Sequence, residues 1–167
     1  LSKSKKQGGK AETERPVVEI GSGNGYWAYL LRRAGITLHA VDNAASAWRT
    51  TWIDDTIIAD GVAFLTSPPQ KLSDTVGGKG VKNAMLLLVY PQVGADFTGK
   101  VLRAYEGNVI CVAGTQNSNG FTSFHNELID TWIARERKDF DLVCRVPLPS
   151  FAGKDEAFFI FVRKARP

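Results

Sequence analysis

The sequence has few of the features that mark membrane, secreted or disulfide-stabilised proteins. Its longest apolar run, Ala84 to Tyr90, is far shorter than the roughly 18 residues that a membrane helix needs. The first ten residues lack the apolar core of a signal peptide. The two cysteines, Cys111 and Cys144, lie in apolar, strand-like runs. We therefore expect reduced, buried thiols, no membrane association, and a cytoplasmic or other reducing intracellular location.

The chain also lacks a basic surface outside its first residues. Its 21 Lys and Arg exceed its 17 Asp and Glu by four, and four lysines lie in the first ten residues, which contain no acid. The remaining chain is balanced, so its charge does not indicate a nucleic-acid surface. A composition of 44% hydrophobic and 23% charged residues is ordinary for a globular protein. We expect a flexible basic tail over residues 1–15 and a single domain over residues 16–167.

Apolar runs and helical patterns alternate along that domain. This alternation predicts an α/β fold with a doubly wound, mostly parallel sheet between two helical layers. No helical pattern separates the last two strands, so they should form an antiparallel hairpin. The irregular stretch from Thr66 to Lys82 predicts a mobile surface loop. The expected strands are 16–20, 37–41, 56–59, 84–89, 108–113, 141–146 and 157–162, and the expected helices are 26–34, 97–105 and 124–133, the last with Thr122 or Ser123 as its N-cap.

The most specific motif is Glu19-Ile20-Gly21-Ser22-Gly23-Asn24-Gly25, between an expected strand and an expected helix. Closely spaced glycines let the backbone turn tightly and let a ligand approach it. In a doubly wound sheet such a turn lies at the carboxyl end of a strand, where ligands bind. The spacing differs from the G-x-G-x-x-G of phosphate-binding turns, and a phosphate has no use for the carboxylate of Glu19. An amino group, or a cationic ligand with a carboxylate of its own, would use it.

The motif resembles the first motif of the class I S-adenosylmethionine-dependent methyltransferases, which have a Rossmann-like fold. The resemblance runs from about Pro16 to the C-terminus and implies a seven-stranded sheet whose last strand runs antiparallel. In that family the glycine turn packs against the methionine part of the cofactor S-adenosyl-L-methionine, and the acid helps to hold its amino group. The resemblance therefore implies cofactor contacts for Glu19, Gly21, Ser22, Gly23, Asn24 and Gly25.

A second acid is expected at the end of the next strand, because one carboxylate can accept hydrogen bonds from both ribose hydroxyls. Asp42, followed by Asn43, lies 21 positions after Gly21 and fits that role. Helix capping is the alternative explanation of Asp42. For Glu19 the alternative is a surface acid, which its apolar strand disfavours because an unpaired buried charge is costly.

Two further elements follow from the resemblance. In that family a third acid, at the end of the third strand, contacts the adenine amine, and Asp60 matches this position. Gly61 follows it, and Val62 would pack against the adenine ring as an apolar surface. The turn after the central strand, here Tyr90 and Pro91, lies beside the sulfonium and the methyl acceptor in similar enzymes. Asp60 is equally explained as a common strand-end acid, and Tyr90 as a core aromatic.

Other chemically reactive side chains have ordinary structural explanations. Cys111 could be a nucleophile, but the centre of a strand favours a structural thiol. His39 lies within a strand. His125 begins the expected long helix after the polar segment 115–120, which could line an acceptor pocket, although capping and loop solvation explain the same residues.

The acceptor stays open between a small molecule, a protein and RNA. The turn after Tyr90 lacks the Pro-Pro-aromatic pattern of enzymes that methylate exocyclic base amines. Either the acceptor is small, or a partner protein or a region upstream of Leu1 completes the substrate site. We consider three functions: an active methyltransferase, a catalytically idle methyltransferase-like scaffold or cofactor-binding module in a larger assembly, and a dinucleotide oxidoreductase, which the glycine spacing disfavours. No catalytic residue is assigned, and no metal site is expected.

Overall fold

The computed structural model describes residues 15–47, 50–68, 80–94, 96–117 and 121–165. The expected basic tail, apart from Arg15, lies outside the described residues. So does the central part, 69–79, of the loop expected between Thr66 and Lys82. The end of that stretch forms a short 3₁₀ helix, η1 (Gly80–Asn83).

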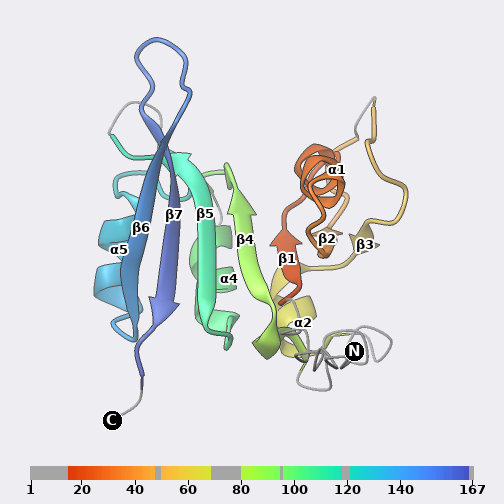
Figure 1. The fold of residues 1–167 in the computed structure, drawn as a ribbon, viewed down its shortest axis with the longest axis horizontal. Coiled ribbons are helices and arrows are strands. Elements are labelled where there is room, and N and C mark those ends of the chain that lie inside the picture. Colours follow the sequence, from red (N-terminus) through yellow and green to blue (C-terminus); the bar gives the residue numbers. More distant parts are fainter. Residues whose placement is uncertain (1–14, 48–49, 69–79, 95, 118–120, 166–167) are drawn as a thin grey trace, which may run out of the picture.

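A seven-stranded sheet forms the centre of the molecule, in the order β3-β2-β1-β4-β5-β7-β6 (Figure 1). Strands β1 to β5 run parallel, whereas β7 pairs antiparallel with both β5 and β6. The predicted fold class, including the closing antiparallel hairpin, is therefore confirmed. The strands are β1 (Val17–Ile20), β2 (Leu38–Asp42), β3 (Ile57–Ile58), β4 (Met85–Val89), β5 (Val109–Thr115), β6 (Phe140–Leu148) and β7 (Glu156–Arg163).

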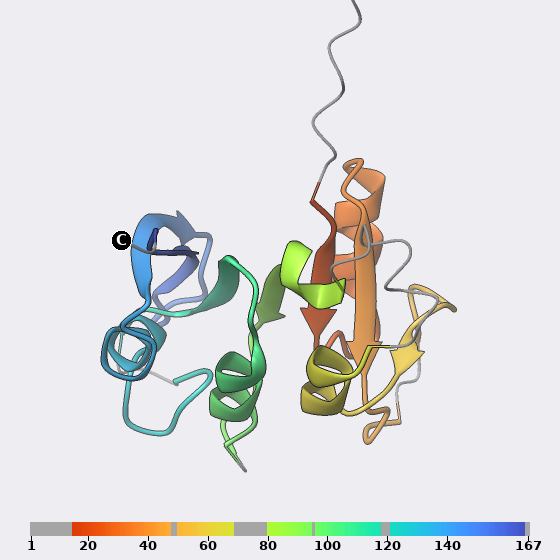
Figure 2. The same ribbon diagram turned by 90° about the horizontal axis from the view of Figure 1, so that it is seen from below.

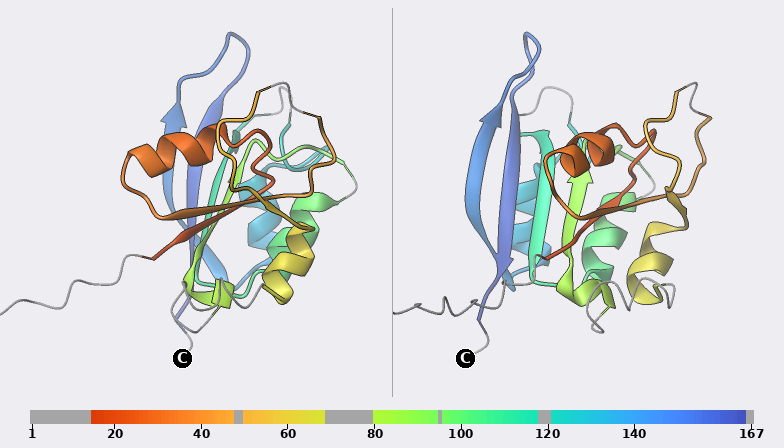
Figure 3. Two further views of the ribbon diagram at one scale, coloured as in Figure 1. Left: turned by 90° about the vertical axis from the view of Figure 1, so that its right-hand side faces the viewer. Right: turned by 45° about the vertical axis from the view of Figure 1, so that its right-hand side comes forward.

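Helices cover the two faces of the sheet unequally. Helix α1 (Tyr26–Arg33) lies on one face, over β1 and β2, and the other three α-helices lie on the opposite face (Figures 2 and 3). The face that α1 shares therefore carries no helix over β5 and β7 within the described residues (Figure 1). None of the helices in the described ranges is both long and apolar enough to cross a membrane. The three helices opposite α1 are α2 (Gly61–Thr66), α4 (Phe97–Ala104) and α5 (Ile129–Glu136).

The helices also correct two sequence predictions. Helix α2 is not expected from the sequence, because its six residues are too short for a periodic pattern. Helix α5 begins at Ile129 with Leu128 as N-cap, so the predicted start near Phe124 is wrong. Phe124 lies in the preceding loop and stacks on Trp132, with 4.9 Å between ring centroids. The loop folds back so that this partly buried ring packs against the core, which explains why a helical spacing occurs without a helix.

The proposed N-caps of that helix have other partners. The hydroxyl of Thr122 accepts a hydrogen bond from the Thr115 N–H, and the Thr122 N–H donates to the Thr115 hydroxyl. Ser123 has a left-handed backbone, with φ of 71°. These contacts attach the loop to the end of β5 rather than to α5. His125 lies in the same loop and not in a helix.

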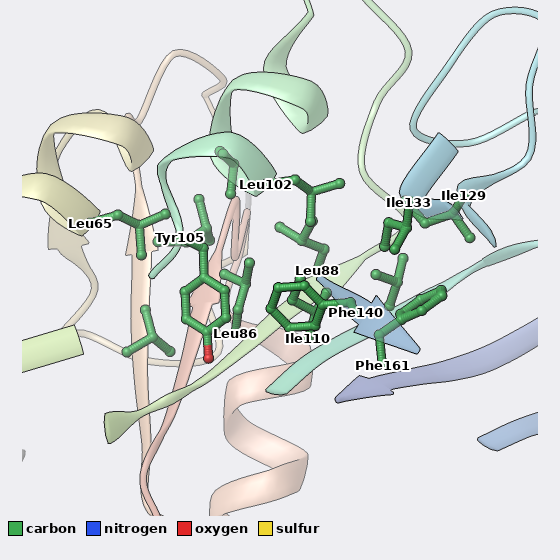
Figure 4. Close-up of a cluster of buried hydrophobic side chains, with 14 of the residues drawn as sticks. Leu65, Leu86, Leu88, Leu102, Tyr105, Ile110, Ile129, Ile133, Phe140 and Phe161 are labelled. Carbon is green, nitrogen blue, oxygen red and sulfur yellow. The ribbon is translucent and has the colours of Figure 1, made fainter. Parts of the chain in front are cut away.

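The larger core lies between the sheet and the layer of α2, α4 and α5 (Figure 4). Tyr105 is buried there, and its hydroxyl donates to the Ala84 or the Val109 carbonyl and accepts from the Val109 N–H. This hydroxyl therefore joins the starts of β4 and β5, where backbone groups would otherwise lack partners. The cysteines are free thiols, as expected, but Cys111 and Cys144 are half-buried rather than fully buried.

Replacing Tyr105 with Phe should lower the free energy of unfolding by about 1–3 kcal/mol, because buried backbone groups lose a partner. Urea denaturation at neutral pH measures this change. The matched control is Tyr29→Phe, whose hydroxyl accepts an exposed hydrogen bond from Arg33. We expect a change below roughly 0.5 kcal/mol for this control. Equal effects of the two substitutions would contradict the structural role of Tyr105.

Candidate cofactor site

The glycine turn between β1 and α1 has a backbone that favours glycine. Gly21, Gly23 and Gly25 have φ angles of 78°, 56° and 77°. Side chains other than Gly are strained in this left-handed region. The N–H groups of Gly21 and Ser22 both donate to the Val41 carbonyl, at 2.8 and 3.1 Å, so the turn is attached to the end of β2. The sequence motif thus forms a tight turn at the carboxyl edge of the sheet.

Glu19, at the base of this turn, is a buried acid. Glu19 is only 1% exposed, and its Oε2 has no hydrogen-bond partner among the described residues. Burial raises the pKa of Glu19 to about 7, a shift that nearby Arg32 opposes and Asp42 reinforces. The alternative of a surface acid is wrong. A buried carboxyl group without a partner is costly unless a ligand supplies one.

Asp42 contacts the glycine turn directly. Its Oδ2 accepts a hydrogen bond from the Gly23 N–H and its Oδ1 one from the Ala44 N–H, each at 2.8 Å. Each carboxylate oxygen keeps a second lone pair for a further donor. Asn43 Oδ1 accepts from the Ala45 N–H at 3.0 Å. No helix follows β2 in the described ranges 43–47 and 50–56, so helix capping does not explain Asp42.

Asp60 has a structural role that sequence reasoning missed. It is the N-cap of α2, and its Oδ1 accepts from the Ala63 N–H at 2.9 Å. A Cβ on Gly61 would lie 2.5 Å from Cγ2 of Ile20, so glycine lets α2 approach β1 closely. Val62 is half-buried against the larger core. Because β3 pairs with β2, Asp60 follows a strand end next to that of Asp42.

Tyr90 and Pro91 form the turn after β4, beside the glycine turn in the strand order. Tyr90 has φ of 45°, a conformation that is uncommon for aromatic residues. Its hydroxyl donates to Oε2 of Glu156 at 3.1 Å, and burial followed by this contact raises the pKa of Tyr90 to about 12. The Pro91 carbonyl accepts from the Ser123 N–H at 2.8 Å. Sequence reasoning missed Glu156, which the antiparallel hairpin brings to this edge.

The other candidates lie apart from the glycine turn or have structural surroundings. His125 lines an open hollow of about 730 Å³ between the loop 121–128 and α5. His39 is in β2, where burial lowers its pKa. Burial also raises the pKa of Cys111 to about 11, which keeps its thiol protonated and makes it a poor nucleophile.

Comparisons with known proteins agree on the fold. No protein-family model matches the sequence, and a search of curated proteins finds no match either. The glycopeptide N-methyltransferase MtfA, solved with S-adenosyl-L-methionine, matches with a TM-score of 0.55 and 12% identity over 92% of this chain and 89% of its own. A 16S rRNA (adenine(1408)-N(1))-methyltransferase from Catenulisporales acidiphilia matches with a TM-score of 0.52 and 14% identity over 94% and 88%.

A protein of the NADB-Rossmann superfamily from Streptococcus agalactiae also matches, with a TM-score of 0.51 and 11% identity. The match covers 92% of this chain but only 64% of that protein. At such identities the similarity concerns the arrangement of strands and helices and not the substrate. The strand order, the antiparallel β7 and these matches together show that the chain has the Rossmann-like fold of the S-adenosylmethionine-dependent methyltransferases.

Proposed function

We propose that this protein is an S-adenosylmethionine-dependent methyltransferase. The observation that carries the proposal is the buried Glu19 carboxyl group, whose Oε2 has no hydrogen-bond partner among the described residues, at the base of a turn that needs glycine. A ligand with an ammonium group would supply the missing partner. Gly21, at the start of the turn, is exposed, and its lack of a side chain lets an amino-acid-like ligand approach the backbone there. The residues present therefore fit the methionine part of S-adenosyl-L-methionine.

The remaining cofactor contacts extend this assignment along the carboxyl edge of the sheet. Asp42 holds the turn through Gly23 and has lone pairs left for the two ribose hydroxyls. Asp60, beyond β3, would accept a hydrogen bond from the adenine amine through Oδ2, because its Oδ1 caps α2. The other residues in the proposed site are Gly21, Ser22, Asn24, Gly25, Asn43, Gly61, Val62, Tyr90 and Pro91.

The cofactor supplies a methyl group on an already activated sulfonium, so the protein mainly aligns donor and acceptor and excludes water. The acceptor class is a small molecule, a protein or RNA, in line with the varied acceptors named for the structural neighbours. A partner protein or a region upstream of Leu1 would complete the acceptor site if the acceptor is large. We place the protein in a reducing intracellular compartment, in keeping with its free thiols.

Asp42→Ala should weaken binding of S-adenosylhomocysteine by roughly 100-fold, because two charge-assisted hydrogen bonds are lost and the Gly23 N–H loses its partner. Isothermal titration calorimetry of the whole chain measures this change. Asp54→Ala, an exposed acid between β2 and β3, is the matched control and should leave the affinity unchanged. Binding of NADH without binding of S-adenosylhomocysteine would favour an oxidoreductase and contradict the proposal.

Methyl transfer needs a separate measurement. Whole chain and S-adenosyl-L-methionine carrying a labelled methyl group are incubated with small-molecule, protein and RNA fractions. Label in one fraction identifies the acceptor class. A protein that binds the cofactor but labels none of the three fractions would be an idle cofactor-binding module rather than an enzyme.

A further inference from the structure

Glu156 is held at the carboxyl edge of the sheet by two sets of contacts. Its Oε2 accepts the hydrogen bond from the Tyr90 hydroxyl at 3.1 Å. Its backbone pairs with Thr115, at the end of β5. The neighbouring residue is also fixed, because Gln116 donates to the Asp155 carbonyl and carboxylate, each at 2.8 Å. The first residue of β7 therefore has a defined position beside the ends of β4 and β5.

Tyr90 acts as the donor in this pair. Its pKa of about 12 keeps the hydroxyl protonated at neutral pH, so Glu156 receives the hydrogen bond as the acceptor. The left-handed backbone of Tyr90 is strained for a residue with a side chain. Such strain at the end of a strand beside a candidate site often serves to aim a side chain.

Glu156 lies on the far side of β4 from the glycine turn. Neighbouring strands are about 4.8 Å apart, and β1, β4, β5 and β7 are consecutive in the sheet. The backbone of Glu156 is therefore roughly 10 Å from the end of β4 and farther from the glycine turn, and the Tyr90 side chain reaches across to it.

A second observation concerns a buried polar side chain attached to the same turn. Ser123 is 4% exposed, and its Oγ has no hydrogen-bond partner among the residues that the structure describes. Its N–H donates to the carbonyl of Pro91, the residue after Tyr90. A buried hydroxyl group without a partner is thus attached to the same turn, and a bound molecule would relieve its cost.

The charge that develops during methyl transfer determines which acceptor fits. When a neutral amine attacks, its lone pair forms the N–C bond, and the electron pair of the breaking C–S bond stays on sulfur. The positive charge passes from sulfur to nitrogen, and a proton then leaves to water. A carboxylate beside the nitrogen stabilises that charge, whereas it repels a phenolate, a carboxylate or a phosphate.

We propose that Glu156 binds the amino group of the methyl acceptor and that the acceptor is an aliphatic amine. Tyr90 is the positioning residue that orients the Glu156 carboxylate. This inference rests on the proposed methyltransferase function and adds the substrate class to it. The amine can belong to a small molecule or to a peptide, because both present the same group to Glu156.

The test measures transfer of a labelled methyl group by the whole chain. The amine probes are n-butylamine, lysine ethyl ester and an octapeptide with a free N-terminus. The matched probes without an amine are n-butanol, catechol and the same octapeptide acetylated at its N-terminus and lacking lysine. We expect label in the amine probes only. Faster labelling of the small amines would indicate a small-molecule acceptor, and faster labelling of the octapeptide would indicate a peptide acceptor.

Three variants test the residues. Glu156→Gln should lower kcat/KM for the amine by roughly 30-fold or more, because the neutral amide does not stabilise the cationic nitrogen. Its affinity for S-adenosylhomocysteine should stay within about twofold of wild type, since Glu156 does not contact the cofactor in this proposal. Tyr90→Phe should raise KM for the amine more than it lowers kcat. Glu106→Gln, which changes an exposed acid before the start of β5, is the control and should change neither constant by more than about threefold.

The outcomes separate this inference from the proposed function. If the wild-type chain does not bind S-adenosylhomocysteine, both the proposed function and this inference are overturned. Three outcomes would overturn the inference alone, each with normal binding of S-adenosylhomocysteine by the wild-type chain. They are no label in any amine probe, label in catechol or butanol, and amine methylation by Glu156→Gln at the wild-type rate. If Glu156→Gln does not fold, as judged by its thermal transition, an unchanged KM in Tyr90→Phe would overturn it.

Discussion

We expect the Glu19→Gln variant to be more stable than the wild-type chain at pH 8 by about 3 kcal/mol, and equally stable near pH 4. The reason is the difference between the ordinary pKa of 4.5 and the value of about 7 that Glu19 has when it is buried. Each pKa unit corresponds to about 1.4 kcal/mol. Glutamine has the same shape but no charge to bury.

The direction of the pH dependence follows from proton binding. The folded chain binds the Glu19 proton more tightly than the unfolded chain does, so the contribution of this group is fully favourable below about pH 4.5. It is lost as the pH rises to about 7 and is constant above that. Urea denaturation of both proteins at pH 4, 6 and 8 measures the effect.

Glu106→Gln is the matched control, because Glu106 is exposed and its pKa is lowered by Lys82. This variant should gain no stability at pH 8. The wild-type chain and Glu19→Gln could instead lose the same free energy of unfolding between pH 4 and pH 8. That result would show that the pKa of Glu19 is not raised in the folded chain.

The same substitution should weaken cofactor binding while it stabilises the fold. We expect the affinity of Glu19→Gln for S-adenosylhomocysteine to fall by roughly 10- to 100-fold, the cost of one hydrogen bond to a charged group. In the wild-type chain this affinity should increase as the pH rises through about 7, because only the ionised carboxylate attracts the ammonium group. A variant that is both more stable and weaker in binding is typical of a site that trades stability for function.

The parts of the fold that the sequence predicts correctly depend on local patterns. The run Met85–Val89 is apolar at every position because β4 is covered by neighbouring strands and by helices, and its burial needs no distant information. The glycine turn is equally local, since its three left-handed residues coincide with the three glycines. The position of Asp42 follows from the length of one strand–helix–strand unit.

The errors arise where distant contacts decide the structure. Phe124 has helical spacing from Trp132, yet it reaches that ring from a loop. Helix α2 exists because Asp60 caps it and Gly61 allows close packing on Ile20, and neither contact is visible as periodicity.

Glu156, the residue that we propose binds the acceptor, is not identified by the sequence. It is 66 positions from Tyr90 and is brought to the site because β7 inserts between β5 and β6. Local patterns predict the hairpin but not which of its strands lies beside β5. The carboxylate that would select the acceptor is therefore visible only in three dimensions.

Gly25→Ala should lower the free energy of unfolding by about 3 kcal/mol or more, through two separate effects. Its φ of 77° is strained for alanine, and the new Cβ would lie 2.4 Å from Cγ1 of Ile53. Gly35→Ala separates these effects, because Gly35 has φ of 87° but nothing within 4 Å of an added Cβ. We expect this control to cost about 1 kcal/mol, the backbone strain alone, and to leave S-adenosylhomocysteine affinity unchanged. Equal costs for the two variants, measured by urea denaturation, would contradict the clash.

Ile53 also determines whether substitution of Gly25 affects cofactor binding as well as stability. The segment after β2 is attached to the glycine turn through Ile53 and through the Trp52 N–H, which donates to the Asn24 carbonyl at 2.9 Å. Displacing Ile53 should therefore distort the turn and weaken S-adenosylhomocysteine binding by roughly 10-fold. In the double variant Gly25→Ala/Ile53→Ala the clash is absent, so the loss of stability should be smaller than the sum of the two single losses by about 1–2 kcal/mol. Recovery of binding in the same double variant would show that Ile53 transmits the distortion, whereas additive losses would show that the left-handed backbone of Gly25 alone controls the turn.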